Sequence, residues 1–214
     1  MIDFYQFPGT CSQGVYVALE ETATPYRPHL VNLLDGSSHQ PAYLAVNPAG
    51  QVPALGLEDG QVLTEAGAIL FWLGETHPQA GLLPTAPLER ARLLETLSFI
   101  SYSLHGTAGN IWKPEKLTDD PASAPALKSH AIRRYLAALA ILEARLGDKP
   151  WLLGEKFSLA DCHLLPFWHW AKRWKLDLAA LPRLNAWHAR MLARPAVEKV
   201  LAAEKADLKA LLGK

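Results

Sequence analysis

The chain has 214 residues, half of them apolar, and its 21 basic residues balance 21 acidic ones to a formal net charge of zero. That length suits one large domain or two small ones. No basic stripe or block stands out, which argues against nucleic acid or an anionic membrane as the main partner. No apolar run reaches the roughly 18 residues of a membrane span, and the first residues lack a secretory signal pattern. Two cysteines make no disulfide framework, so we expect a reducing, cytoplasmic setting.

The first 80 residues alternate between strand-like and helix-like pieces, bounded by proline, glycine and asparagine. Their order, β-α-β-α-β-β-α, predicts an α/β domain with one mixed sheet, which fits a thioredoxin-like fold. Thr64 is expected to cap the last helix. The expected pieces are strands over 2–7, 26–33, 52–57 and 61–63, helices over 12–21 and 65–76, and a helical turn over 40–46.

The rest of the chain shows helical periodicity only. We expect domains over 1–80 and 88–214, joined by a proline-rich linker at 81–87. The segment 159–174 is apolar nearly all round, so it should be the buried central helix, begun by a Ser158–Asp161 capping box and bent or loosened at Pro166. The expected helices cover 88–112, 127–146, 159–174, 182–193 and 196–212.

Cys11 follows the Pro8-Gly9 turn at the start of the first helix. A thiol there faces the positive end of the helix dipole, so we expect a lowered pKa and a nucleophilic thiolate. The stretch Cys11-Ser12-Gln13-Gly14 has no second cysteine. The expected oxidation product is therefore a mixed disulfide with an external thiol. Cys162, after the capping box, is predicted to be a packing residue.

Two further motifs suit a peptide-like ligand. In the run NPAGQVPAL at 47–55, a cis Pro53 would turn the backbone N–H and C=O of Val52 outward. At Thr64-Glu65-Ala66, a helix start offers N–H groups to a carboxylate, and Glu65 could receive an amino group. Taken alone, each motif is also compatible with an ordinary turn or an ordinary helix start.

The eight histidines are scattered and neither cysteine has a ligand-like companion, so no metal site is expected. His105 falls late in the first long helix of the second domain, at the expected domain interface. The seven tryptophans suit a core as well as an apolar substrate pocket.

Taken together, the segments resemble a bacterial beta-class glutathione S-transferase of the cytosolic superfamily. The resemblance covers nearly the whole chain in order and spacing. It implies an N-terminal thioredoxin-like domain, a C-terminal all-helical transferase domain, no permanently bound cofactor, and glutathione as co-substrate. The matching pieces are PGTCS at 8–12, ALEE at 18–21, NPAGQVPAL at 47–55, DGQVLTEAGAI at 59–69, GLLP at 81–84, FIS and LH within 99–105, LLGEKFSLAD at 152–161 and LARPAVEKVLAAE at 192–204.

The resemblance also implies residue roles. Cys11 would contact the sulfur of glutathione and could form a mixed disulfide with it, and His105 would lie near that sulfur. Ser12 or a backbone N–H could donate to the sulfur, with Tyr5 a weaker candidate. The residues expected to bind glutathione are Cys11, Gln51, Val52, Pro53, Glu65 and Ala66. Those expected in the second-substrate pocket are Tyr5, Gly9, Trp112 and Trp168.

Two departures from the family pattern concern the site. Many of these transferases place a serine after the glutamate, whereas Ala66 can offer only its N–H. Around His105, Tyr102-Ser103-Leu104-His105-Gly106 lacks the usual glutamate and lysine. Three functions therefore stay open: conjugation of glutathione to small apolar electrophiles, a glutathione-dependent disulfide reductase or peroxidase acting through Cys11, and a non-catalytic binding protein.

The apolar side chains around the domain junction suggest assembly. We expect that they cannot all face one intramolecular core and that the remainder marks an interface. The family resemblance points the same way, toward a twofold homodimer that pairs the first domain of each subunit with the second domain of the other. The side chains concerned are Leu70, Phe71, Leu93, Leu97 and Ile100.

Overall fold

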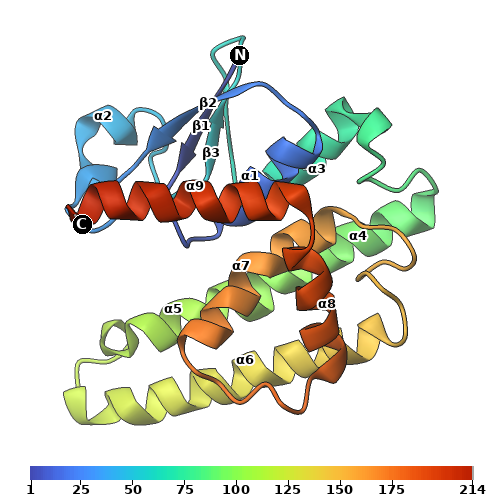
Figure 1. Ribbon diagram of the computed structural model, residues 1–214. Coiled ribbons are helices and arrows are strands. Elements are labelled where there is room, and N and C mark those ends of the chain that lie inside the picture. Colours follow the sequence, from blue (N-terminus) through green and yellow to red (C-terminus); the bar gives the residue numbers. More distant parts are fainter. Residues whose placement is uncertain (214) are drawn as a thin grey trace.

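The first domain in the computed structural model, which describes residues 1–213, is a four-stranded mixed sheet flanked by helices (Figure 1). The strand order is β2-β1-β3-β4; β1 is parallel to β2, whereas β3 is antiparallel to both β1 and β4. The expected element order and the mixed sheet are thus confirmed. The elements are β1 (Ile2–Gln6), α1 (Ser12–Glu21), β2 (Tyr26–Leu30), α2 (Pro41–Leu44), β3 (Ala54–Gly56), β4 (Val62–Thr64) and α3 (Ala66–Thr76).

The start of α3 differs by one residue from the prediction. Thr64 does not cap the helix, because it ends β4 and pairs there with Ala54. Glu65 is the N-cap instead, and α3 begins at Ala66. The strand expected from Val52 begins only at Ala54, after Pro53, which has no N–H to give to a ladder.

The remaining residues are helical, as expected, but the first long helix is not uniform. The segment Ile100–His105 is a π-helix between α4 and α5, and π segments often occur at functional sites. Single 3₁₀ turns lie at Ser37–His39, Pro78–Ala80, Pro114–Leu117 and Pro121–Ser123. The helices are α4 (Pro87–Phe99), α5 (Gly106–Trp112), α6 (Ala124–Leu146), α7 (Leu159–Arg173), α8 (Pro182–Leu192) and α9 (Pro195–Leu212).

Helix α7 is the buried centre of the second domain, and its capping box forms as predicted. The Asp161 carboxylate accepts hydrogen bonds from the backbone N–H and hydroxyl of Ser158 at 2.9 Å. It also accepts from the Leu152 N–H at 3.0 Å and from the Trp187 indole at 2.9 Å. Asp161 therefore fixes both the start of α7 and its contact with α8.

The two domains share one continuous core, and α1 packs directly on α7. Gly14 permits this approach, because a Cβ at that position would lie 2.6 Å from the carbonyl oxygen of Cys162. Helix α9 then returns across the first domain (Figure 1). Arg194, at its start, forms a bidentate pair with Glu21 at 2.7 and 2.8 Å. The division at 81–87 stays a prediction; no helix or strand occupies residues 81–86.

The side-chain argument for an exposed apolar interface is wrong in its particulars. Leu70, Leu93, Leu97 and Ile100 are all buried within the single chain. Only Phe71 is partly exposed, and Arg90 lies over its ring. These residues fit one core because α3, α4 and α7 pack against one another, so one side chain can face two neighbours.

Among residues 1–213, no helix is both long and apolar enough to cross a membrane.

Candidate active site

A small hollow of about 30 Å³ lies at the junction of the two domains. It is polar for its size, with a thiol, two imidazoles and a carboxylate around it. The first domain contributes a helix start, a proline loop and a second helix start, whereas the second domain contributes the π-helical segment and α7. The lining residues are Cys11, Asn47, Gln51, Val52, Pro53, Glu65, Ala66, Ser101, His105 and His163.

Cys11 lies at the N-cap of α1, and its thiol donates to the carbonyl of Val52 at 3.3 Å. The residue is only 5% exposed. Burial raises the pKa of the thiol to about 12, and the charge of Glu65 acts in the same direction. The backbone N–H groups of Cys11 and Ser12 lower this pKa, as expected at a helix start, but burial outweighs them. The predicted low thiol pKa is therefore wrong for the chain without ligand.

The loop before Pro53 is held rigidly by its own side chains. Tyr43 and Asn47 both donate to the Gln51 carbonyl, at 2.6 and 2.7 Å. The Val52–Pro53 peptide bond is cis, as predicted. The backbone of Val52 thus lies beside the Cys11 thiol at the edge of β3. Gly50 turns the chain with a φ of 62° and leaves no room for a Cβ, which would clash with His39.

Glu65 is held in an unusual backbone conformation at the start of α3. Its φ of 65° and ψ of 114° are rare for any residue other than glycine. Such conformations are concentrated at ligand-binding positions, because the surrounding fold must impose them. The carboxylate is exposed and acts electrostatically on both Cys11 and His105. Glu65 and Ala66 therefore present a carboxylate and a helix N-terminus at one end of the hollow.

His105 ends the π-helical segment and faces the hollow from the second domain. Its ring packs against Phe167 and Trp170, with centroids 5.3 and 5.6 Å away. Burial lowers its pKa, and Glu65 opposes that shift. His105 and Cys11 thus line the same hollow, and burial favours the neutral imidazole; that His105 lies near the sulfur of glutathione stays a prediction.

Three lining residues were not predicted: Asn47, Ser101 and His163. Ser101 and His163 form a hydrogen bond, Oγ to Nε2, at 2.9 Å. A signal for His163 did exist, because a histidine within the largely apolar, buried stretch of α7 needs a polar partner. No comparable signal pointed to Ser101, since its position depends on the π-helical turn.

Five predicted site residues do not line the hollow, and three of them are engaged elsewhere in the fold. The Ser12 hydroxyl is engaged with the Phe7 carbonyl at 3.1 Å and with Thr10 at 2.7 Å. Tyr5 stacks on His29 and packs with Tyr43 under α2. Trp168 is fully buried and packs edge-on against Trp187. Sequence reasoning failed here because each residue type is compatible with a site and with a core.

Gly9 and Trp112, predicted for the second-substrate pocket, lie beside the hollow rather than in it. The Gly9 carbonyl accepts from the Trp170 indole at 2.8 Å. A Cβ on Gly9 would lie 4.0 Å from a guanidinium nitrogen of Arg173. That guanidinium also lies over the ring of Trp112, 5.2 Å from its centroid. Within residues 1–213, Arg173 forms no ion pair with a carboxylate.

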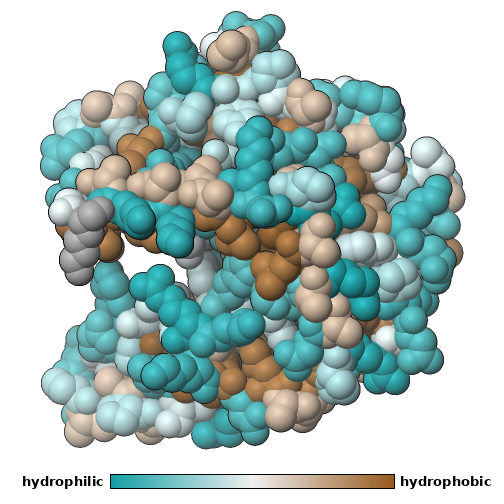
Figure 2. Space-filling model, in the orientation of Figure 1, coloured by the Kyte–Doolittle hydropathy of each residue, from teal (hydrophilic) through white to brown (hydrophobic). Residues whose placement is uncertain are grey.

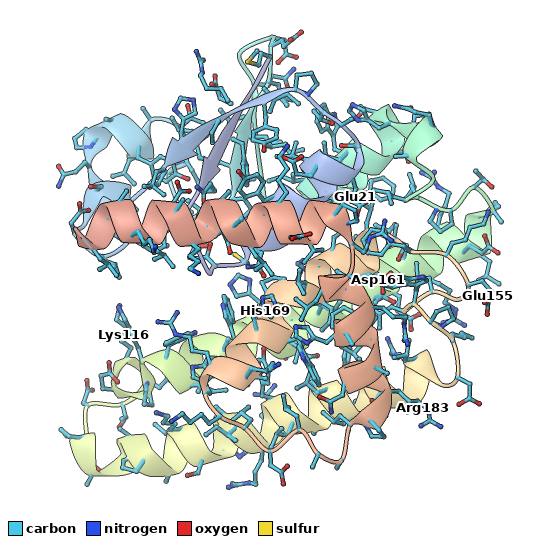
Figure 3. The ribbon with its side chains drawn as sticks, viewed as in Figure 1. Glu21, Lys116, Glu155, Asp161, His169 and Arg183 are labelled. Carbon is cyan, nitrogen blue, oxygen red and sulfur yellow. The ribbon has the colours of Figure 1, made fainter. Side chains whose placement is uncertain are left out.

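The molecular surface is indented near the C-terminal end of α7. Figure 2 shows this indentation between the C-terminal part of α9 and the helices around α5, with hydrophilic residues on the side of α5. In Figure 3 the Lys116 side chain points toward this gap.

No group of three or more metal-ligating side chains occurs among the residues described, 1–213.

Comparisons with known proteins identify the family of the chain. The models for the N-terminal and C-terminal domains of glutathione S-transferase match residues 9–76 and 114–195. The glutathione S-transferase GstA of Escherichia coli O157:H7 is 33% identical over 94% of this chain and 97% of its own length. The maleylacetoacetate isomerase of Pseudomonas aeruginosa is 33% identical, over 94% and 95% respectively.

Solved structures extend the match to the fold. A glutathione transferase homolog from Sulfitobacter, determined with bound glutathione, is 34% identical, with a TM-score of 0.88 over 94% of this chain and 96% of that one. The matches also include a beta-class transferase from Sphingomonas chungbukensis, 32% identical, with a TM-score of 0.82 over 94% and 98% of the two chains. The predicted similarity to bacterial beta-class enzymes is thus confirmed.

Proposed function

The chain belongs to the glutathione S-transferase family, and from that premise we propose that it binds glutathione in the hollow beside Cys11 and transfers it to a small electrophile. The enzyme class follows from the family; the substrate and the residue roles are the proposal. Glutathione serves as substrate and is not permanently bound.

One observation carries the proposal: two elements that suit a peptide ligand, the Val52–Pro53 loop and the start of α3, line the same hollow as Cys11. The Val52 backbone, beside the cis proline, suits the cysteinyl unit of glutathione as a short strand partner. The start of α3 suits the γ-glutamyl end, with Glu65 for its amino group and the Ala66 N–H for its carboxylate. A tripeptide spanning both would place its sulfur near Cys11 and His105.

The state of Cys11 favours conjugation over disulfide chemistry. A buried thiol with a raised pKa is a poor nucleophile at neutral pH, and its sulfur is already engaged with the Val52 carbonyl. We therefore assign Cys11 to positioning the sulfur of glutathione. The nucleophile is the sulfur of glutathione itself, which His105, neutral and partly buried, faces as the candidate base.

The test is conjugation of glutathione to 1-chloro-2,4-dinitrobenzene, followed in parallel with reduction of a glutathione mixed disulfide. Conjugation that survives in Cys11→Ser, within about tenfold of wild type, is the expected result. Disulfide reduction that is lost in Cys11→Ser, with no conjugation by wild type, would instead establish the oxidoreductase. Glutathione binding without either activity would establish a binding protein.

A specific observation favours an acidic second substrate over the purely apolar one expected. Arg173 lies between Trp112 and the Gly9 loop without a carboxylate partner among residues 1–213, and an arginine in this setting suits a planar carboxylate. A relative that is 33% identical bears the name maleylacetoacetate isomerase. We propose that electrophiles with a carboxylate are preferred.

The comparison of a carboxylated electrophile with its methyl ester tests this preference. In Arg173→Gln, kcat/KM for the acid is expected to fall roughly tenfold or more while the ester is unaffected. Lys175→Gln, two residues beyond, is the matched control for loss of a positive charge. If kcat/KM falls equally for the acid and the ester, Arg173 does not bind the carboxylate of the substrate.

We further propose a homodimer in the cytoplasm. A groove between α3 and α4, lined by Phe71, Leu94, Leu97 and Tyr102, supports the dimer, because Leu94 and Tyr102 are large and exposed. Sedimentation equilibrium at micromolar concentration should give twice the mass of one chain, and Tyr102→Glu should give one. A single-chain mass for the wild type at all concentrations would contradict the dimer.

A further inference from the structure

A series of hydrogen bonds connects the loop between β1 and α1 to the second domain. Glu204 on α9 accepts from the Gly9 N–H at 3.1 Å, and its other oxygen lies 2.5 Å from the amide nitrogen of Gln13. The amide oxygen of Gln13 lies 2.8 Å from Nδ1 of His169, whose Nε2 lies 3.0 Å from Nε2 of His188. Helices α1, α7, α8 and α9 each contribute one side chain to this series, which we call the Glu204 network.

The side chains of the Glu204 network are largely withdrawn from solvent. Gln13, His188 and Glu204 are buried, and His169 is partly buried. Burial lowers the pKa of both imidazoles to about 4, and the charge of Lys172 acts in the same direction. Burial raises the pKa of the Glu204 carboxyl to about 7, although its two hydrogen bonds oppose that shift. Near pH 7 the imidazoles are therefore neutral, and Glu204 is the member of the network that titrates.

The charged groups near the Glu204 network come from several elements. On α9 itself, the carboxylate of Asp207 raises the pKa of Glu204. Helix α1 contributes a neutral amide, and α8 contributes an imidazole that stays neutral. Helix α7 contributes Lys172, which acts on both imidazoles, and Arg173, which has a guanidinium nitrogen 4.0 Å from the position of a Cβ on Gly9. The like charge of Asp207 therefore makes Glu204 easier to protonate.

A network of this composition can be hydrogen-bonded in two directions. An ionised Glu204 only accepts, so the Gln13 amide donates to it and accepts from Nδ1–H of His169. Nε2 of His169 then accepts from Nε2–H of His188. A protonated Glu204 can donate its O–H to the amide oxygen of Gln13, whose rotated NH₂ group donates to Nδ1 of His169. Nε2–H of His169 then donates to His188, and each hydrogen bond of the network is kept.

We propose that the side chains of the Glu204 network are positioning residues for the loop that carries Cys11, and that protonation of Glu204 reverses the direction of the network. The carboxylate takes up one proton from solvent, the amide of Gln13 rotates by half a turn, and each imidazole changes tautomer while keeping one proton. The Gly9 N–H then loses a charged acceptor, and charged hydrogen bonds are roughly twice as strong as neutral ones. The loop is therefore held more weakly when Glu204 is protonated.

Nitrogen-15 NMR of the histidine rings distinguishes the two directions without any ligand. In the wild type at about pH 8.5, we expect the proton of His169 on Nδ1 and that of His188 on Nε2. At about pH 5.5 each ring should carry its proton on the other nitrogen, because both imidazoles are still neutral there. Both changes should share one midpoint near pH 7, the pKa of Glu204. His169→Gln and His188→Gln assign the two sets of resonances.

Glu204→Gln should fix the network in its acid direction at every pH. The Gly9 N–H requires an oxygen, so the amide nitrogen of the new side chain takes the position facing α1 and must donate. His169 should then carry its proton on Nε2 even at about pH 8.5. Asp207→Asn should move the midpoint of the wild-type change to lower pH and leave both end states unaltered. Glu198→Gln, which removes an exposed carboxylate of α9, is the matched control and should change nothing.

Calorimetry with S-methylglutathione measures the consequence for binding, since the sulfur of this ligand carries no proton. Its affinity for the wild type should fall ~3–10-fold as the pH is lowered from about 8 to about 6. Glu204→Gln should bind it equally at both pH values, with the weaker affinity. This effect on the ligand rests on the proposed function, whereas the reversal of the network does not.

Tautomers of His169 and His188 that stay the same from about pH 8.5 to about pH 5.5 would overturn the proposal. The wild type carries this test alone, so a variant that fails to fold does not decide it. Reversal with an unchanged affinity for S-methylglutathione would also overturn the proposal, because the network would then not position the loop. If the wild type binds no glutathione or S-methylglutathione at any pH, the proposed function fails, and reversal of the tautomers still establishes the two directions of the network.

Discussion

The two sides of the hollow are built on different principles. The first domain presents backbone to it, through the cis Val52–Pro53 bond and the start of α3, together with the Cys11 thiol and the Glu65 carboxylate. The second domain presents side chains, namely Ser101, His105 and His163. Backbone groups suit recognition of a peptide ligand that does not vary, because substitutions leave them in place. Side chains can be substituted, so they can be adapted to a particular reaction. Under the proposed function, binding is assigned mainly to the first domain and chemistry to the second, and variants on either side or at their junction test this division.

The largest effect is expected on the backbone side. Val52→Pro removes the N–H that would pair with the cysteinyl unit, so glutathione affinity should fall at least ~100-fold by calorimetry. Val52→Ala keeps the N–H and should bind within a few-fold of wild type. If the proline variant binds normally while remaining folded, glutathione does not use this strand edge.

The junction is tested by Gly14, where α1 approaches α7. A valine there would meet backbone of α7, with its Cβ 2.6 Å from the Cys162 carbonyl oxygen, so we expect a loss of roughly 2–3 kcal/mol in the free energy of unfolding. Gly109→Ala is the matched control, since a Cβ there meets nothing within 4 Å; helix propensity predicts a gain of up to ~1 kcal/mol. Urea titrations measure both. If the Gly14→Val variant is as stable as the wild type, the packing of the two domains does not depend on this close approach.

Glu65 provides a charge on the otherwise backbone-built side. Glu65→Gln keeps the shape of the side chain but removes its charge, so affinity for glutathione should fall about tenfold at neutral pH. Acetylation of the ligand's amino group supplies the control. If Glu65→Gln weakens binding of the acetylated ligand by the same factor as binding of glutathione, Glu65 does not receive the amino group.

The smallest effect concerns the reactivity of Cys11 without ligand. Because its raised pKa keeps the thiol protonated, alkylation by iodoacetamide should be slow at neutral pH and should rise steadily as the pH increases toward about 12. Glu65→Gln removes a charge that raises this pKa, so alkylation should become a few-fold faster. Peptide mapping must place the label on Cys11 and not on Cys162. An alkylation rate of Cys11 that is already maximal at neutral pH would show that its pKa is low, as its position at the helix start first suggested.

The same division decides how much could be predicted from the sequence. The backbone side was predictable, because Val-Pro, the glycine of the NPAG turn and the start of α3 are local signals. On the side-chain side, His105 was predicted, and His163 was signalled only by the need of a buried histidine for a polar partner. Ser101 faces the hollow from a π-helical turn that no local pattern predicts.

Two errors have the same physical origin. The dipole argument for Cys11 was correct in sign, but it left out burial, which depends on the other domain packing over α1. Likewise the apolar side chains at the domain junction were expected to exceed what one small domain can cover, whereas α3, α4 and α7 pack against one another and bury all of them except Phe71, which is partly exposed. Sequence patterns report the local environment, whereas the pKa of Cys11 and the burial of these apolar side chains both depend on long-range packing.

The central claim, that the backbone of the first domain places the sulfur of glutathione against side chains of the second, is tested most directly by a crystal structure with glutathione. We predict a tripeptide extended along Val52, its amino group at Glu65, and its sulfur unbonded, within hydrogen-bonding distance of Cys11 and on the side of the hollow that His105 lines. A sulfur covalently joined to Cys11, or a ligand bound outside this hollow, would contradict the claim.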